Sequence, residues 1–338
     1  MPATLAELLS NALDARSTLC AKLAEENTDA YRLFDGDTEG RPGLSVDRLG
    51  ELVLVQTFDA PLDAEEEEGI ARLYRERLQL DAVVYNAFSA RHPGAGNALS
   101  GEQLAQAELP RVVHEMGVKY MVQGRHEERA PQLPLAMRAA RRRLMALAPG
   151  KTVLSLFAHT CSVGVVAARA GAEFVLNVDA SEAAIKVGRS NAKLNALPHR
   201  PRFMVSDLFA AMRQFAGIGQ PRFVRGKRMP KFPEVEARQF DLVFLDPPRY
   251  AKNLFGVVDV VNDYPALFKP ALLATAEGGT LICSNPAPEV DAEAWLAQLQ
   301  RSALKAGREV REARWIVPEA DFPAADGQPA LKIVELSV

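Results

Sequence analysis

Cysteine and histidine are scarce in this sequence, and their scarcity argues against two kinds of site. The three cysteines, Cys20, Cys161 and Cys283, lie far apart and form no CxxC spacing, so neither a disulfide framework nor a zinc site is predicted. The five histidines are scattered as well. We therefore expect no bound metal.

Long apolar runs and a strong charge of one sign are also missing. No run approaches the roughly 20 apolar residues of a membrane helix, and the N-terminus is acidic where a signal peptide would be basic and then apolar. A cytoplasmic location without membrane contact is expected. The formal net charge of -3 gives no overall attraction to nucleic acid, so RNA binding must depend on local basic patches.

The chain has enough apolar residues, 48% of 338, to form one large core or two moderate ones. Its first part has a helical pattern over 4–24, opened by a Thr4–Glu7 capping box, and then Gly, Pro and Asp turns with strand patterns at 51–56, 81–88 and 118–123. We predict an N-terminal helical arm over 1–28 and a small α+β domain over 29–130, a candidate for RNA contact. A larger domain follows over 131–338.

The larger domain alternates short apolar runs with stretches of helical composition. This alternation predicts a doubly wound α/β fold with a parallel sheet. Ligands bind such sheets where the strands end at their carboxyl side. The five predicted strands cover 152–158, 174–180, 202–207, 240–248 and 279–285.

Polar side chains follow three of these strands. The loop after the first strand has small residues but only Gly164, so the glycine signature of a nicotinamide dehydrogenase is absent. Asp179 ends the second strand, about 20 residues on, where an acid can accept hydrogen bonds from a ribose, and Asp207 ends the third. These features favour an adenosine-type ligand. The alternatives are a tight turn for the loop and helix N-caps for Ser181 and Asp207.

The fourth strand ends in "DPPRY", the most specific feature of the sequence. Two prolines stiffen the backbone, because each fixes its own φ and restricts the residue before it. The stretch can therefore aim Asp246 and the Pro247 carbonyl at a ligand, with Tyr250 as a platform for a flat base. The alternative is a rigid turn that only ends a buried strand.

Together, "LFAHTCSVG", "NVDASEAAIKVGRSNAKLN", "SDLF" and "FDLVFLDPPRYAKN" resemble class I S-adenosylmethionine-dependent methyltransferases. Within them, the chain is similar to the group that methylates bases of bacterial large-subunit (23S) ribosomal RNA, and the likeness extends to "YRLFDGDTEGRPGLSVDRLGELVLVQ" upstream. The resemblance implies a Rossmann-like domain with S-adenosylmethionine as cofactor. It implies RNA, as 23S rRNA or a large-subunit precursor, as partner.

The resemblance also assigns roles to matching residues. The cofactor would be held by Phe157, Ala158, His159, Thr160 and Cys161 at its methionine end, by Asp179, Ala180 and Ser181 at its ribose, by Asp207 and Leu208 at its adenine, and by Asp246 and Pro247. The substrate would be bound by Arg138, Pro248, Arg249 and Tyr250, with Asp246 and Tyr250 facing the target base. Two stretches depart from the pattern of relatives: Cys161 and Ser162 replace two glycines, and "PLAMR" replaces "FLDQR", keeping Arg138.

The stretch "GGTLICSNPAP" bears on which base atom is methylated. Carbon 5 of cytosine requires a cysteine thiolate that first adds to carbon 6, whereas a ring nitrogen with a lone pair requires mainly orientation. Aligned on the glycines and Ser284, the chain has Asn285, not Cys283, at the place of the nucleophile in 5-methylcytidine enzymes. This Ser-Asn pattern resembles relatives that methylate a guanine nitrogen. Asn285 would contact the base, and Cys283 is expected to be a buried core residue, with the nucleophile as the alternative.

Two basic clusters are candidates for RNA contact. Five cations and two phenylalanines lie in one loop, Arg222, Arg225, Lys227, Arg228 and Lys231, of which Arg225 and Arg228 are predicted to bind substrate. A solvated loop is the alternative. For the second cluster, Arg141 to Arg143, a solvated helix face is favoured.

The sequence thus predicts a methyltransferase acting on a base of 23S rRNA, with a guanine nitrogen favoured. The alternatives are a 5-methylcytidine enzyme that uses Cys283 and a catalytically inactive homologue that binds S-adenosylmethionine or RNA. The target nucleotide and the oligomeric state are left open.

Overall fold

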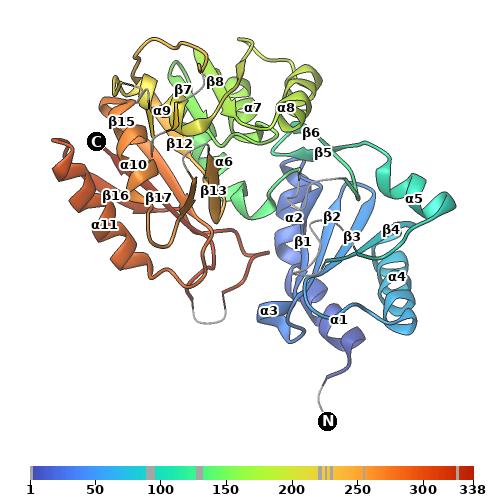
Figure 1. Ribbon diagram of the computed structural model, residues 1–338. Coiled ribbons are helices and arrows are strands. Elements are labelled where there is room, and N and C mark those ends of the chain that lie inside the picture. Colours follow the sequence, from blue (N-terminus) through green and yellow to red (C-terminus); the bar gives the residue numbers. More distant parts are fainter. Residues whose placement is uncertain are drawn as a thin grey trace. The chain divides into compact units, whose positions relative to one another are not determined.

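The chain divides into two compact units, and each is described by itself (Figure 1). The first unit contains Met1–Arg138 and Pro318–Gln328, and the second contains Ala139–Val317 and Pro329–Val338. The structure, a computed structural model, describes residues 3–88, 96–126, 132–219, 223–224, 227–228, 231–253, 256–324 and 327–338. Within these ranges no helix has the length and apolar character needed to cross a bilayer.

The first unit is built on a four-stranded sheet in the order β1-β2-β3-β4, in which only β3 and β4 run parallel. Its strands are β1 (Ala30–Asp35), β2 (Leu44–Leu49), β3 (Leu52–Thr57) and β4 (Ala82–Ala87), with α4 (Ala64–Leu78) as the crossover between the last two. The other elements are α1 (Leu5–Ala15), α2 (Ser17–Glu25), α3 (Gly36–Glu39), α5 (Gly101–Glu108), β5 (Arg111–Glu115), β6 (Val118–Val122) and the short 3-10 helix η1 (Leu135–Met137).

The N-terminal helical pattern is confirmed, with one break and one addition. Thr4 and Glu7 form the expected capping box, and the pattern is interrupted at Arg16 into two helices. The first helix is an integral part of the unit, because Leu9 is buried in one cluster with Tyr74 of α4. β1 and β2 lie in the stretch for which glycine, proline and aspartate had indicated turns. The glycines and the proline of this stretch fall between the two strands, at 36–43, and so they do not interrupt either strand.

A buried ion pair joins the returning segment Pro318–Gln328 to the rest of the first unit. Asp321 is fully buried, and its Oδ1 accepts from Nη2 of Arg138 at 2.6 Å while its Oδ2 accepts from the backbone N of Arg32 at 3.0 Å. Arg138, 1% exposed, also donates Nε to Glu319 at 2.8 Å. Buried charges are tolerated only when paired and hydrogen-bonded, so this segment and Arg138 depend on each other.

The second unit contains a seven-stranded sheet in the order β16-β17-β15-β12-β7-β8-β9. The five strands expected from the sequence run parallel, which confirms the predicted α/β fold: β7 (Thr152–Leu156), β8 (Phe174–Asp179), β9 (Arg202–Val205), β12 (Phe240–Leu245) and β15 (Thr275–Asn285). The sequence analysis had missed β16 (Glu312–Trp315) and β17 (Lys332–Ser337), the latter antiparallel to both of its neighbours.

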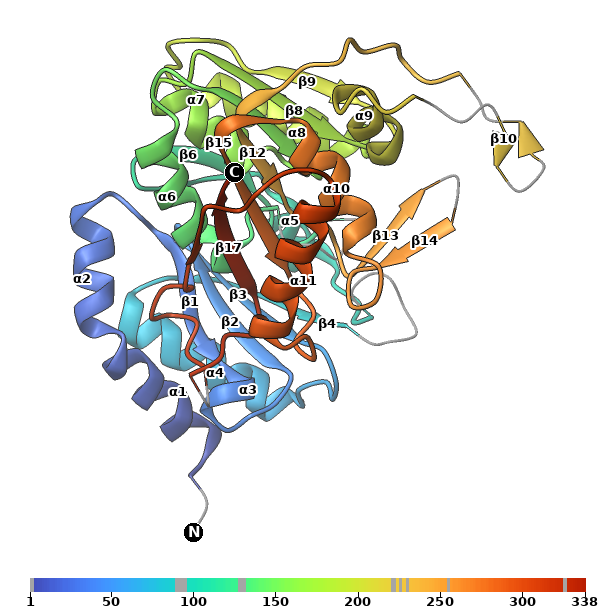
Figure 2. The same cartoon turned by 90° about the vertical axis from the view of Figure 1, so that its left-hand side faces the viewer.

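Helices cover both faces of this sheet, as Figure 2 shows with α10 and α11 on one side and α6 and α7 on the other. One face carries an extensive core, in which Leu154, Val243 and Leu281 lie with apolar residues of three helices. These helices are α9 (Leu208–Phe215), α10 (Pro265–Leu273) and α11 (Ala292–Lys305). The remaining helices are α6 (Arg138–Leu147), α7 (Ser162–Arg169) and α8 (Glu182–Leu194), and two short hairpins are β10 (Phe223–Val224) with β11 (Lys227–Arg228) and β13 (Tyr250–Asn253) with β14 (Gly256–Asp259).

The chain order reverses between β7 and β12, which lie side by side at the centre of the sheet. Loops diverge to opposite faces at such a point and leave a crevice at the carboxyl ends of the strands. The loop after β7 and the "DPPRY" stretch after β12 therefore meet at this edge.

Asp321→Ala is expected to destabilise the protein by about 3–5 kcal/mol, because it leaves the Arg138 guanidinium buried without its closest partner. The measurement is urea unfolding. The exposed Asp81→Ala in the same unit is the control, expected within about 0.5 kcal/mol of wild type. Equal stabilities for both variants would contradict a structural role for this ion pair.

Candidate functional site

The loop after β7 has a strained backbone. Phe157, His159 and Cys161 have φ values of 56°, 47° and 61°, in the left-handed region that residues other than glycine rarely adopt. The surrounding structure holds them there: the backbone N of His159 donates to Oδ2 of Asp179 at 2.7 Å, and Asn191 donates Nδ2 to the Thr160 carbonyl at 3.0 Å. The loop is thus held by hydrogen bonds with the end of β8 and with α8.

Two glycines allow helices to approach this loop and its sheet closely. A Cβ at Gly188 of α8 would lie 2.4 Å from Sγ of Cys161, and one at Gly164 of α7 would lie 1.9 Å from Oδ1 of Asn177 on β8. Both distances are far below contact. Cys161 is fully buried, and burial raises the pKa of its thiol, so the sulfur stays neutral and acts in packing.

Asp179 and Asp207 lie at the ends of β8 and β9, as predicted. Asp179 accepts from the backbone N of His159 and, through Oδ1, from that of Ser181 at 2.8 Å. Ser181 and Asp207 cap α8 and α9 by accepting from Ala184 at 3.1 Å and Ala210 at 3.0 Å, so the capping alternative is realised for both. A carboxylate has about four acceptor positions, so capping and ligand binding are compatible for Asp207.

Asp246 lies beside Ser284, because the parallel register pairs Leu245 of β12 with Cys283 of β15. The Ser284 hydroxyl donates to Oδ1 of Asp246. Burial raises the pKa of Asp246 to about 6, against the opposing effects of the Ser284 hydrogen bond and of the charges on Arg141 and His159. Ser284 was not predicted as a site residue. Its position opposite Asp246 in the pairing of the two strands could have indicated the contact.

Cys283 points to the other face of the sheet from Ser284, because side chains alternate along a strand. It is fully buried in the core that β12 and β15 form with α10 and α11, where the Tyr264 ring also lies. Burial raises the pKa of the Cys283 thiol far above its usual range. The thiol is therefore neutral and enclosed in the core, as expected of a buried core residue.

Asn285 is fully buried, and its amide is hydrogen-bonded to backbone. Its Oδ1 accepts from the Ala287 N at 3.0 Å, and its Nδ2 donates to the Val260 carbonyl at 3.4 Å. Lys332 of β17, which pairs with Asn285, donates Nζ to the carbonyls of Ala287 at 2.7 Å and Pro288 at 3.0 Å. These side chains shape the loop after β15, and contact of Asn285 with a base stays a prediction. The contact of Lys332 with this loop could not be predicted from local sequence, because Lys332 lies almost 50 residues after Asn285.

Tyr250 is the exposed aromatic residue of the "DPPRY" stretch, with 54% of its surface accessible. The guanidinium of Arg249 lies 5.2 Å from the centre of the Tyr250 ring and forms ion pairs with Glu289 at 2.6 Å and Asp259 at 3.4 Å. Pro247 is buried and Pro248 is exposed. The stretch thus presents an aromatic ring and a held cation to solvent.

Several other predicted residues lie elsewhere. Arg138 is buried in the ion pair with Asp321 in the first unit, so its guanidinium is held by protein groups, and substrate binding by it stays a prediction. Arg228 is exposed on β11, and Arg225 lies outside the described residues. The expectation of a solvated face for Arg141 to Arg143 was wrong for Arg141, which is fully buried. Arg142 is exposed, and Arg143 is partly exposed and pairs with Glu335 at 2.7 Å.

The remaining cofactor residues belong to the same edge of the second unit. Ala158 and Thr160 are buried in the loop after β7, and Leu208 is buried in the first turn of α9. Ala180, after β8, is exposed. Over the part of the chain that the structure describes, no group of three His, Cys, Asp or Glu side chains is arranged to hold a metal ion.

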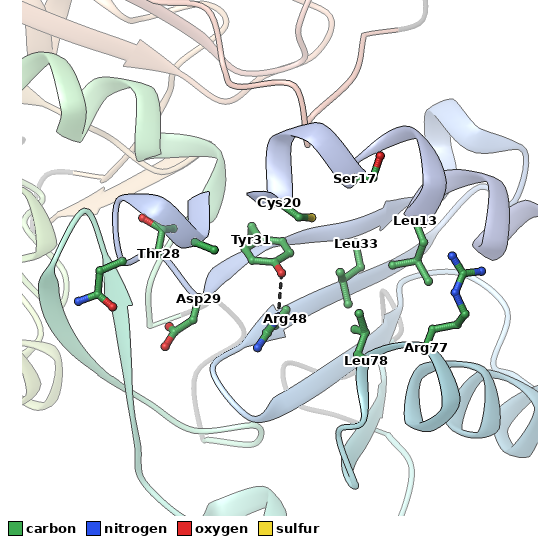
Figure 3. A pocket seen from close by; sticks show the side chains of 12 residues that line it. Leu13, Ser17, Cys20, Thr28, Asp29, Tyr31, Leu33, Arg48, Arg77 and Leu78 are labelled. Carbon is green, nitrogen blue, oxygen red and sulfur yellow. Dashed lines mark hydrogen bonds between the residues drawn. The ribbon is translucent and has the colours of Figure 1, made fainter. Parts of the chain in front are cut away.

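A cavity of about 370 Å³ lies in the first unit, lined by residues of its helices and sheet (Figure 3). Cys20 and Tyr31 line it, and the Tyr31 hydroxyl accepts from Arg48 at 3.0 Å. Arg77, at its rim, is held by Ser10 at 2.8 Å and by Asp14. None of the sequence-predicted site residues lines this cavity.

Gly188→Ala is expected to destabilise the protein by about 1–3 kcal/mol, because the added methyl group overlaps Cys161 and displaces the loop after β7. Adding Cys161→Gly removes the overlapping atoms and the left-handed strain, so the double variant should recover at least about 1 kcal/mol in chemical unfolding. Gly69→Ala, at a helical glycine with nothing within 4 Å, is the control and should be neutral or stabilising. If the two substitutions changed the free energy of unfolding additively, Gly188 and Cys161 would not be in contact.

Comparison with known proteins identifies the family. A family model described as S-adenosylmethionine-dependent methyltransferase matches residues 32–335. A curated relative, the ribosomal RNA large subunit methyltransferase I of Erwinia tasmaniensis, is 26% identical over 308 residues, which cover 90% of this chain and 72% of that protein.

Solved structures show the same fold. SMU.776, solved in complex with SAH, superposes with a TM-score of 0.79 at 21% identity over 100% of this chain and 83% of that chain. The tRNA m1G37 methyltransferase of M. jannaschii has a TM-score of 0.55 at 18% identity, over 96% of this chain and 76% of that one. Because the family model spans most of both units, the chain belongs to the S-adenosylmethionine-dependent methyltransferases.

Proposed function

We propose that this protein methylates a base of 23S rRNA, or of a large-subunit precursor, and that the acceptor is a guanine nitrogen. The family gives the reaction and the methyl donor. The curated relatives, which are named for methylation of large-subunit ribosomal RNA, support RNA as the substrate.

The observation that carries the choice of acceptor atom is the position of Cys283. Methylation of cytosine at carbon 5 requires a thiolate that reaches the base. Here the thiol is enclosed in the core beneath α10, and its raised pKa keeps it protonated. Nitrogen methylation requires no such nucleophile, and it fits the side chains present at this edge of the sheet.

The donor set at the strand ends fits S-adenosylmethionine. Asp179 accepts backbone hydrogen bonds from His159 and Ser181, which leaves acceptor positions on its carboxylate suited to the hydroxyls of a ribose. Asp179 would hold the ribose, residues 157–161 the methionine end, and Asp207 with Leu208 the adenine. When bound, the cofactor supplies a methyl group on a positively charged sulfur.

The chain's own residues then orient the base. The exposed ring of Tyr250 can stack on it, with Arg249 beside the ring held by Glu289. Asp246 is mostly ionised at neutral pH, so its Oδ2 can accept a hydrogen bond, or a proton, from the base edge while Ser284 holds Oδ1.

The test of the function is a comparison of rRNA nucleosides from wild-type and deletion strains by mass spectrometry. One methylated guanosine should be lost on deletion and restored by wild type or by Cys283→Ala, because the thiol does not react. Cys20→Ala, which removes a partly buried thiol in the first unit, is the matched control.

Loss of 5-methylcytidine, together with an inactive Cys283→Ala variant, would overturn the choice of guanine. If no nucleoside changed, and the purified protein transferred no labelled methyl group to RNA from the deletion strain, the chain would be an inactive homologue.

The raised pKa of Asp246 gives a prediction about pH. If the ionised carboxylate contacts the base, methyl transfer should fall about tenfold per unit as pH drops below about 6, and Asp246→Asn should be slow at every pH. The folded protein favours the protonated form, so ionisation lowers stability as pH rises from about 4 to about 6. The free energy of unfolding of Asp246→Asn should therefore be about 1–3 kcal/mol higher than that of wild type at pH 8. A variant that is both active and no more stable would contradict this role.

A further inference from the structure

A second cavity in the first unit, of about 280 Å³, lies on one face of the four-stranded sheet. Alternate residues of a strand point to opposite faces. Leu33, Val55 and Tyr85 are in the core with α1 and α4, whereas Arg32, Gln56 and Asn86, their neighbours in sequence, line the cavity. The cavity is therefore on the face that α1 and α4 do not cover, where the strands present polar and aromatic side chains.

Two phenylalanines, Phe58 and Phe88, form an aromatic platform in the lining of this cavity. Phe58 and Phe88 directly follow β3 and β4, which are parallel and pair Thr57 with Ala87, so the register brings the two rings together. The rings are stacked at a centroid distance of 5.5 Å and an interplanar angle of 9°. Phe58 is 39% exposed although it is large and apolar.

Next to the platform lies a guanidinium in a fixed orientation. Arg125 donates Nε to Oδ1 of Asn86 at 2.8 Å and Nη2 to Oδ1 of Asn97 at 2.9 Å. Asn86 in turn donates Nδ2 to the Gly124 carbonyl at 2.7 Å. Because these bonds fix both side chains, little conformational entropy is lost when a ligand binds beside them.

The chemistry of the lining matches a nucleobase better than an aliphatic or an acidic ligand. The amide of Gln56 provides donors and an acceptor, as the edge of a base requires. Gln123 also lines the cavity, where its amide donates to the Glu108 carbonyl and accepts from Gln132. Arg32 is paired with Asp47 at 2.8 Å, so its charge is balanced, and Arg125 adds a positive charge suited to a neighbouring phosphate. Stacking on an aromatic ring beside hydrogen-bonding side chains is how proteins recognise unpaired RNA bases.

We infer that this cavity binds one unstacked base of the RNA substrate, with the base stacked on Phe58 and its edge or phosphate near Arg125. The site lies in the first unit, whereas the residues proposed to bind the cofactor lie in the second. The inference rests on the proposed function, because it takes RNA as the substrate. It gives the first unit a role in selecting single-stranded RNA.

The test uses the full chain and two readouts. The first is the fluorescence of a single-stranded RNA oligomer that contains 2-aminopurine, a base analogue quenched by stacking. Phe58→Ala should weaken RNA binding about 10- to 100-fold and abolish the quenching, and Phe58→Trp should preserve both. Val112→Ala, which truncates another exposed apolar residue of the same unit, is the matched control and should leave RNA binding unchanged.

The second readout is methyl transfer. Phe58→Ala should raise KM for RNA by a similar factor, with kcat and the affinity for S-adenosylmethionine unchanged. The inference is overturned, while the proposed function stands, if wild type methylates RNA and Phe58→Ala has the same KM and the same quenching. If wild type transfers no methyl group but its quenching still depends on Phe58, the proposed function fails and the base-binding site remains. If only small aromatic molecules, and no RNA, compete at Phe58, the inference is also overturned.

Discussion

The parallel register between β12 and β15 decides which side chains lie together at the candidate site. It pairs Leu245 with Cys283, and so it places Ser284 against Asp246. A shift by one residue would reverse both faces: the thiol would leave the core and the serine would enter it. Lys332 and Asn285 support this register from the next strand and loop, because their hydrogen bonds hold the backbone that follows β15. The observed register thus keeps the thiol in the core and Ser284 beside Asp246.

The sequence was sufficient for features that depend on neighbours along the chain. The five parallel strands, the Thr4–Glu7 cap and the buried Cys283 followed from apolar patterns, capping residues and alternation. Features that depend on distant residues were missed. The segment around Asp321 packs in the first unit, where Asp321 pairs with the buried Arg138. The two residues are 183 positions apart, so no local sequence pattern predicts their pairing. The burial of Arg141 was also missed, because a run of arginines has the composition of a solvated helix face.

The loop after β7 shows how one site tolerates an unusual residue. A left-handed backbone favours glycine, yet Cys161 occupies such a position. Its cost, of order 1 kcal/mol, is offset because the side chain fills the space above Gly188 and the neighbouring peptide groups are held by Asp179 and Asn191. Cys161 thus stabilises the loop through a side-chain contact that a glycine at this position could not make.

The charge distribution bears on how such a protein can recognise RNA. The net charge is -3, and Arg32, Arg143 and Arg249 are held in ion pairs. Other arginines, such as Arg200 and Arg301, are exposed. Duplex nucleic acid is bound mainly through phosphates. Unpaired bases can instead be bound by stacking, and each unit presents an exposed aromatic ring beside an arginine, Tyr250 with Arg249 and Phe58 with Arg125. Stacking of this kind does not depend on a net positive charge, so the net charge of -3 is compatible with the RNA substrate proposed above.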